Sequence, residues 1–152
     1  MSRWGPEGPP EEAYSRVSDP AKFAAVHVPG RRVLAELTRR YQVRAEEYQA
    51  QARPAREGRH AAQAGPAVRL VPADPAAWPL TIVFTAATGI EVWAGEEHRL
   101  HLPVCACDAC DETTEESEVH LRDWVGLIVA GTLGEQMAPG APARAAWQVR
   151  PA

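Results

Sequence analysis

Three strand patterns that follow one another without room for a helix between them constrain the fold of this chain most. They are residues 67–73 (AVRLVPA), 79–89 (PLTIVFTAATG) and 90–103 (IEVWAGEEHRLHLP), all rich in β-branched or aromatic residues. Parallel neighbours would need a crossover of a dozen or more residues, usually a helix, which this region does not provide. We therefore predict antiparallel pairing, with a tight turn at Thr88-Gly89 and a last strand that continues, or restarts after Gly95.

Before these strands, the sequence predicts two helices and one more strand. Apolar residues at the spacing of one helix face predict a helix over about 30–40, after a break at Pro29-Gly30. A shorter helix is expected over 20–26, where proline takes the first helical position. From residue 41 apolar and polar residues alternate, which predicts a strand over 41–51. The alternative is one long helix that continues to Gln51.

The clearest helix pattern follows the three cysteines. Thr113 and Glu116 have the spacing of a capping box, and further acidic residues favour the positive end of the helix dipole. The predicted buried face consists of Leu121, Trp124, Val125, Ile128 and Val129. Gly131 and Gly134 are expected to end this helix. These patterns together predict an α+β fold, an antiparallel sheet of about four strands packed against two main helices.

The length of 152 residues indicates a single domain, which we expect to span residues 13–135. Residues 1–12, rich in Pro, Gly and Glu, are expected to form a flexible leader, and residues 53–66 a surface loop. Residues 136–152 form a Pro/Ala-rich tail, which either adds a short edge strand or docks through Trp147.

Composition and motifs exclude several classes of function. No apolar run has the length of a membrane span, and the first residues lack the apolar core of a signal peptide, so we expect a cytoplasmic protein without a membrane partner. The formal net charge of −4 and the lack of an aromatic–basic motif argue against nucleic-acid binding. No nucleophile elbow or glycine-rich nucleotide loop is present, so no catalytic or cofactor-binding residue is predicted. The remaining expectation is a binding or accessory protein with a protein partner, or an enzyme whose site forms only in three dimensions.

The most distinctive motif is a Cys-x-Cys-x₂-Cys cluster formed by Cys105, Cys107 and Cys110. Structural zinc takes four ligands, commonly three or four thiolates with histidine completing the set. His101 is the nearest upstream histidine in the sequence. The motif therefore predicts a structural zinc site with Cys105, Cys107, Cys110 and His101 as ligands.

Two other interpretations of the cysteines stay open. A thiol-redox site would use Cys107 and Cys110, which precede a helix N-terminus where the dipole stabilises a thiolate. The neighbouring carboxylates oppose this, because they raise a thiol pKa but attract a cation. In the other interpretation the thiols are small residues in a strand-to-helix turn, held at its start by Pro103 and capped at its end by Asp111 and Thr113.

Two blocks of this sequence resemble a bacterial family of unknown function from high-GC genomes. EEAYSRVSDPAKF is similar to the family's Tyr-Ser-Arg-Val-Thr-Asp-Pro block, and CACDACDET to its Cys-Gly-Cys-Asp-Ala-Cys-Asp block. This chain departs from the family at Ala106, where the family has glycine, and at the inserted Ala13. The resemblance implies no activity. The family block does not require an upstream histidine, which leaves Asp108, Asp111 or a partner's side chain as alternative fourth donors.

Overall fold

Five antiparallel strands form one sheet in a computed structural model that describes residues 4–18, 20–52, 64–85, 89–105, 107 and 109–151. The strands are β1 (Val43–Ala50), β2 (Gly65–Pro72), β3 (Leu80–Phe84), β4 (Ile90–Ala94) and β5 (His98–Leu102). Each strand pairs with the next one along the chain, so the predicted antiparallel topology is confirmed. The strand count is five rather than about four, because the pattern over 90–103 turns back on itself after Ala94.

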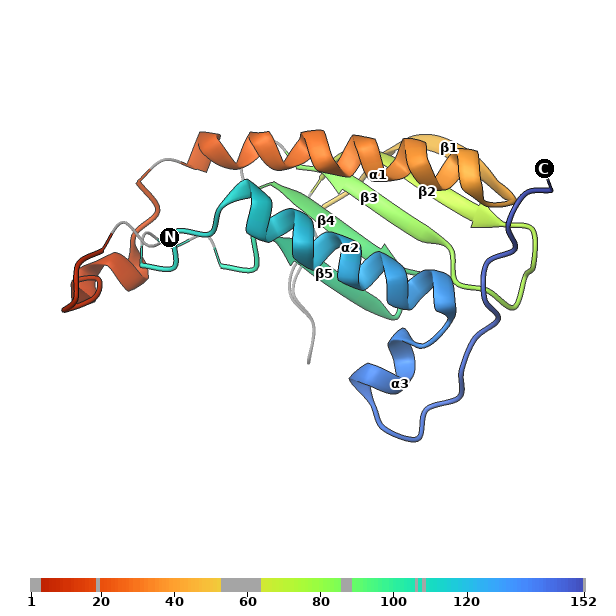
Figure 1. Cartoon of the computed structure of the whole chain (residues 1–152). Helices are drawn as coiled ribbons and strands as arrows, with labels where there is room; N and C mark the ends of the chain where they lie inside the picture. Colours follow the sequence, from red (N-terminus) through yellow and green to blue (C-terminus); the bar gives the residue numbers. More distant parts are fainter. Residues whose placement is uncertain are drawn as a thin grey trace.

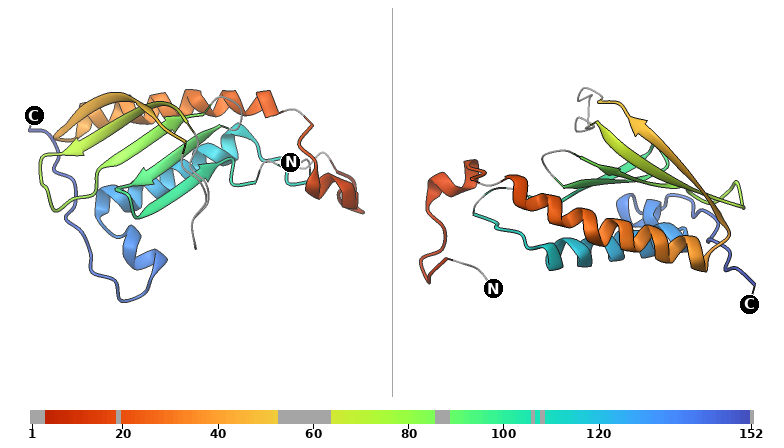
Figure 2. Two further views of the ribbon diagram at one scale, coloured as in Figure 1. Left: turned by 180° about the vertical axis from the view of Figure 1, so that it is seen from behind. Right: turned by 90° about the horizontal axis from the view of Figure 1, so that it is seen from above.

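The helical segments are η1 (Glu11–Ser15), η2 (Pro20–Val26), α1 (His27–Arg40), α2 (Thr114–Ala130) and α3 (Leu133–Met137). The two long helices α1 and α2 run side by side in the same direction across one face of the sheet (Figure 1). Seen from above, sheet and helices form two layers (Figure 2). The predicted α+β fold with two main helices is therefore confirmed.

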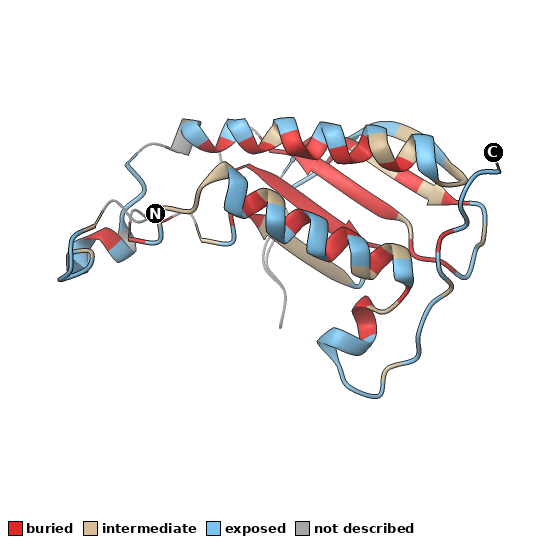
Figure 3. Ribbon diagram, viewed as in Figure 1, coloured by how far each residue is buried: buried red, intermediate tan, exposed pale blue. Residues whose placement is uncertain are grey.

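The core lies between these two layers, where the buried faces of helices and strands meet (Figure 3). Its fully buried side chains include Leu70, Leu80, Ile82, Ile90, Val92, Leu121 and Ile128. Burial of this many large aliphatic groups supplies the main driving force for folding. Within the described part of the chain, no helix has both the length and the apolar character needed to cross a bilayer.

The predicted break at Pro29-Gly30 is wrong, because α1 begins at His27 and runs through both residues. Proline is tolerated there, since the first N–H groups of a helix have no partner within it. Glycine lets the helix approach the sheet: a Cβ at Gly30 would lie 3.2 Å from the ring of Phe84. The long-helix alternative is also wrong, since α1 ends at Arg40 and β1 follows.

The capping box of α2 is confirmed. The Glu116 N–H donates to the Thr113 hydroxyl, and the Thr113 N–H donates to the Glu116 carboxylate, each at 3.1 Å. Gly131 ends the helix in the left-handed conformation at φ 79°. Gly134, which was also expected to end it, lies instead in α3. A Cβ at Gly134 would lie 3.0 Å from the Trp78 ring.

The C-terminal tail docks against the helical layer through Trp147. This indole is 5 % exposed, and its Nε1–H donates to the Trp78 carbonyl oxygen at 2.9 Å. The Trp147 backbone N–H donates to the Val129 carbonyl oxygen at 2.8 Å. Val149 then forms an isolated antiparallel bridge with Tyr41. The tail thus both docks its tryptophan and pairs beside the sheet.

Candidate metal centre

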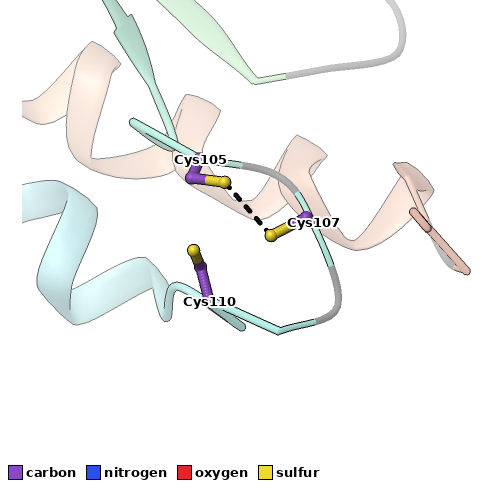
Figure 4. Close-up of side chains that lie close together, drawn as sticks. All are labelled: Cys105, Cys107 and Cys110. Atoms are coloured by element: carbon purple, nitrogen blue, oxygen red, sulfur yellow. Dashed lines mark hydrogen bonds between the residues drawn. The ribbon is translucent and has the colours of Figure 1, made fainter. Parts of the chain in front are cut away.

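Three thiol groups converge in the turn between β5 and α2. The Sγ atoms of Cys105, Cys107 and Cys110 all lie within 4.8 Å of one another, and those of Cys105 and Cys107 are 3.2 Å apart. Figure 4 shows the three side chains pointing toward a common centre. A tetrahedral zinc ion with Zn–S bonds of about 2.3 Å separates its sulfur ligands by about 3.8 Å. The spacing of the three sulfurs therefore suits such an ion after small side-chain adjustments.

Backbone contacts hold the turn in its tight shape. The Asp111 N–H donates to the Cys107 carbonyl oxygen at 3.1 Å, and Asp111 takes the left-handed conformation at φ 47°. The Ala109 N–H donates to the Ala13 carbonyl oxygen, also at 3.1 Å. The turn is therefore tied to the N-terminal segment as well as to α2.

Glu112 connects the start of the turn to its end. Its carboxylate accepts the Val104 N–H at 3.1 and 3.0 Å, and the buried Ser117 hydroxyl donates to it at 2.5 Å. The side chain thus joins the segment that leaves β5 to the first turn of α2. In the sequence, Glu112 stands out only as one of the acidic residues near the positive end of the helix dipole. The available signal was Ser117, a hydroxyl residue on the face of α2 that packs toward the protein core. A buried hydroxyl needs a hydrogen-bond partner.

The two sequence blocks that carry the family resemblance lie against each other at this turn. Ala13, Cys107 and Ala109 form a small buried cluster, with Trp4 and Cys105 packed against it. In addition, the Lys22 ammonium forms a 3.0 Å ion pair with Asp111. The N-terminal block and the cysteine block therefore form one structural unit.

The three thiols shift one another's pKa values. Hydrogen bonds from the Cys110 backbone N–H and the Cys105 thiol lower the pKa of Cys107. Hydrogen bonds between the Cys110 thiol and the sulfurs of Cys105 and then Cys107, followed by desolvation and the charges of these two neighbours, raise the pKa of Cys110 to about 12. The cluster therefore favours one thiolate and opposes further ionisation. A bound cation would reverse this, because it stabilises all three thiolates at once.

We predict that Cys110 of the metal-free protein reacts slowly with iodoacetamide at pH 8, although its side chain is exposed. Its raised pKa leaves little thiolate, which is the reactive form. Replacing both Cys105 and Cys107 with alanine removes the groups that raise this pKa, so the rate should increase about tenfold or more. Peptide mass spectrometry of quenched reactions measures it, with guanidinium-unfolded protein as the control. An equal rate in both folded proteins would contradict the described coupling.

The predicted fourth ligand, His101, does not join the three cysteines. Among the described residues, the one group of three or more ligand atoms within 4.8 Å of each other contains only the cysteines. His101 Nδ1 lies 3.1 Å from the Pro103 carbonyl oxygen. Since side chains alternate along a strand and Leu102 faces the helical layer, His101 points to the opposite face of β5.

The other predicted donors are placed as follows. Asp111 contacts Lys22, and it does not cap α2, because Thr113 is the N-cap. Asp108 lies outside the described residues. All three cysteines are free thiols. The structure therefore brings the three cysteine sulfurs together, and both their role as metal ligands and the identity of a fourth ligand stay predictions.

Comparison with known proteins gives a family but no activity. A family model described as a family of unknown function (DUF6226) matches residues 1–151. No curated protein and no solved structure matches the chain.

Proposed function

The chain belongs to this family of unknown function, and we propose that it is a cytoplasmic, non-enzymatic binding protein whose cysteine turn holds a structural zinc ion. The ligands from this chain are Cys105, Cys107 and Cys110. A water molecule or a side chain of a bound partner takes the fourth position. In this role the metal fixes the turn, and with it the N-terminal segment, in one conformation.

The convergence of three thiols on one point is the observation that carries this proposal. Three thiol groups this close repel one another once ionised, and this repulsion adds to the hydrogen bonds and the desolvation that raise the pKa of Cys110. A divalent cation removes that repulsion, and thiolates are the ligands that zinc prefers in structural sites. The hydrogen bonds from the Cys110 and Ala109 backbone N–H groups to the Cys107 sulfur also orient it as a ligand, as outer-shell contacts do in metal sites.

The same geometry argues against the thiol-redox alternative. A redox thiol must be both exposed and ionised near neutral pH. Cys110 is exposed, but its pKa is raised to about 12. Cys107 has a lowered pKa, but its side chain is only 9 % exposed. Neither thiol combines the two properties.

Metal analysis of protein purified without a metal-binding affinity tag tests the proposal directly. We expect about one zinc ion per chain, and thiols that become titratable only after chelation. Copurified zinc should be absent from the variant in which all three cysteines are replaced with serine. Three titratable thiols and no metal in several tag-free preparations would contradict the proposal. The cysteines would then be small residues of a strand-to-helix turn that binds no metal.

A separate prediction concerns the fourth ligand. We expect His101→Ala to change the zinc affinity by less than about threefold, because the side chain faces away from the helical layer. Removing a true ligand typically lowers the metal affinity by more than about tenfold. Competition with a chromophoric chelator measures the affinity, and Cys110→Ser provides the comparison for a lost ligand. A loss of tenfold or more in His101→Ala would establish it as the fourth ligand.

We also propose that the partner is a protein rather than a nucleic acid. The acidic net charge disfavours binding to phosphate backbones. The arginines of α1 are partly engaged within the fold, since Arg32 pairs with Glu118 and the Arg31 guanidinium lies 4.2 Å from the centre of the Phe84 ring.

A further inference from the structure

Two ion pairs join α1 to α2 at successive turns of both helices. Arg32 donates to Glu118 at 3.1 Å, and Arg122 donates to Glu36 at 2.9 and 3.3 Å. Both pairs connect residues that are 86 positions apart, because the two helices run in the same direction. Arg122 also contacts Glu118 within α2 at 3.2 Å, which connects the two pairs into one interhelical ladder.

The next position of this interhelical ladder lacks its acid. Four residues further along each helix, the same spacing places Arg40 opposite Gly126. Arg40 is exposed, its guanidinium lies 5.4 Å from the centre of the Tyr41 ring, and it forms no ion pair with any residue that the structure describes. At the two preceding turns each charge on α1 is paired with an opposite charge on α2. At the third turn, the cation on α1 faces a glycine.

Gly126 leaves open space at the same place. It lies in the interior of α2, and a Cβ built on it meets no atom within 4 Å. Glycine inside a helix costs stability relative to alanine, and here packing within the described chain gives no reason for it. A bare backbone is useful where another molecule approaches closely. The open space over Gly126 therefore suits an occupant from outside this chain.

Both residues line a groove of about 440 Å³ between the C-terminal halves of α1 and α2. Its apolar lining includes Val33, Leu37, Val125, Val129 and Trp147. The Glu36–Arg122 pair lines it on the side of the interhelical ladder, and tail residues 146, 147 and 149 line it on the other. The groove thus combines an apolar floor with one cation, Arg40, that has no acidic partner among the described residues.

We propose that this groove binds a segment of a partner protein that carries a carboxylate beside a bulky apolar side chain. The carboxylate pairs with Arg40 and completes the third position of the interhelical ladder. The apolar side chain lies on the floor of the groove and passes over the bare backbone of Gly126. A chain segment suits this groove better than a small molecule, because the groove is open to solvent and small ligands are usually mostly enclosed.

This inference goes beyond the proposed zinc site and does not depend on it. The cysteine turn precedes the N-terminus of α2 (Figure 1), whereas the groove is lined by residues from the C-terminal half of this helix. A failure of metal binding would leave the groove unchanged. Equally, a groove that binds nothing would leave the metal proposal untouched.

Selection of a random decapeptide library on the full-length protein tests the groove. We expect enriched peptides that place Asp or Glu next to a large apolar residue. Fluorescence anisotropy with the best fluorescein-labelled peptide should show binding that Arg40→Glu weakens about tenfold or more. Arg39→Glu is the matched control, because it makes the same change in net charge but does not line the groove, and its affinity should stay within about threefold.

Gly126→Glu gives a second, independent variant. Its carboxylate can pair with Arg40 from within the chain, so this variant should unfold at an equal or higher temperature while binding the peptide about tenfold or more weakly. The proposal fails if no peptide is enriched, or if Arg40→Glu and Gly126→Glu bind as tightly as the wild type. Sedimentation could instead show a concentration-dependent dimer that Gly126→Glu abolishes. That result would identify a second copy of this chain as the occupant and would also overturn the proposal of a partner segment.

Discussion

Removal of zinc by a chelator will lower the thermal stability of the protein substantially. A ligand that binds only the folded state stabilises it by about 4 kcal/mol when its free concentration is a thousand times the Kd. For a domain of this size that amount corresponds to about 8–16 °C in Tm. Differential scanning calorimetry with and without chelator, at equal protein concentration, measures the shift. The core between sheet and helices is independent of the metal, so the chelated protein should still unfold cooperatively.

The variant with Cys105, Cys107 and Cys110 all replaced by serine is the matched control for this experiment. It should unfold near the temperature of the chelated wild type, and added chelator should not change it further. Glu112→Gln should give an intermediate Tm, because it weakens the hydrogen bonds that the Glu112 side chain accepts from the Val104 N–H and the Ser117 hydroxyl while keeping all three thiols. An identical Tm for the wild type with and without chelator would contradict the structural role of the metal.

The zinc-dependent part of the stability should disappear at acidic pH. Zinc binds thiolates, so each thiol that is protonated in the metal-free state must lose its proton when the metal binds. The pKa of Cys110 is raised to about 12, so this thiol is protonated at every pH near neutral. Cys107 has a lowered pKa and becomes protonated only as the pH falls through that value. Zinc affinity should therefore fall at least about tenfold per pH unit, and more steeply once Cys107 is protonated.

The topology of the sheet could be predicted because it depends on local patterns. Consecutive strand patterns without a crossover helix permit only antiparallel neighbours, and the five-stranded sheet has that topology. The boundary between β4 and β5 was harder to predict, because Gly95 sits between two stretches that each continue the same alternation. The error at Pro29-Gly30 has a physical reason as well. Proline and glycine break most helices, but the first turn of α1 needs no N–H at Pro29 and uses Gly30 for its approach to the sheet.

In the candidate site too, contacts between residues close in the sequence could be predicted, and contacts between distant residues could not. Cys105, Cys107 and Cys110 lie within six residues, so their convergence was predictable from spacing, and the structure confirms it. The contact between Ala13 and Ala109 joins positions far apart in the sequence and has no local signal. The register of α1 against α2, which places Arg40 opposite Gly126 instead of an acid, likewise depends on tertiary packing.

Replacing Trp147 with alanine will destabilise the fold by about 3–5 kcal/mol, the usual cost of truncating a buried aromatic residue. The indole is 5 % exposed and packs edge-on against Tyr41, with ring centres 5.8 Å apart. It also donates a hydrogen bond to the Trp78 carbonyl oxygen, which would lose this donor inside the protein. Urea unfolding followed by far-UV circular dichroism measures the change, because the signal does not depend on the removed indole.

Two further variants separate the contributions to the Trp147 effect. Trp147→Phe keeps most of the apolar contact but removes the Nε1–H, so it should cost about 1–3 kcal/mol, the penalty of an unsatisfied buried acceptor. Met137→Ala, at a side chain that is 50 % exposed, should change the stability by less than about 0.5 kcal/mol. If Trp147→Ala were as mild as Met137→Ala, the tail would not be part of the folded core. Because Trp147 also forms one wall of the groove, a large cost would mean that the groove exists only while the tail is docked.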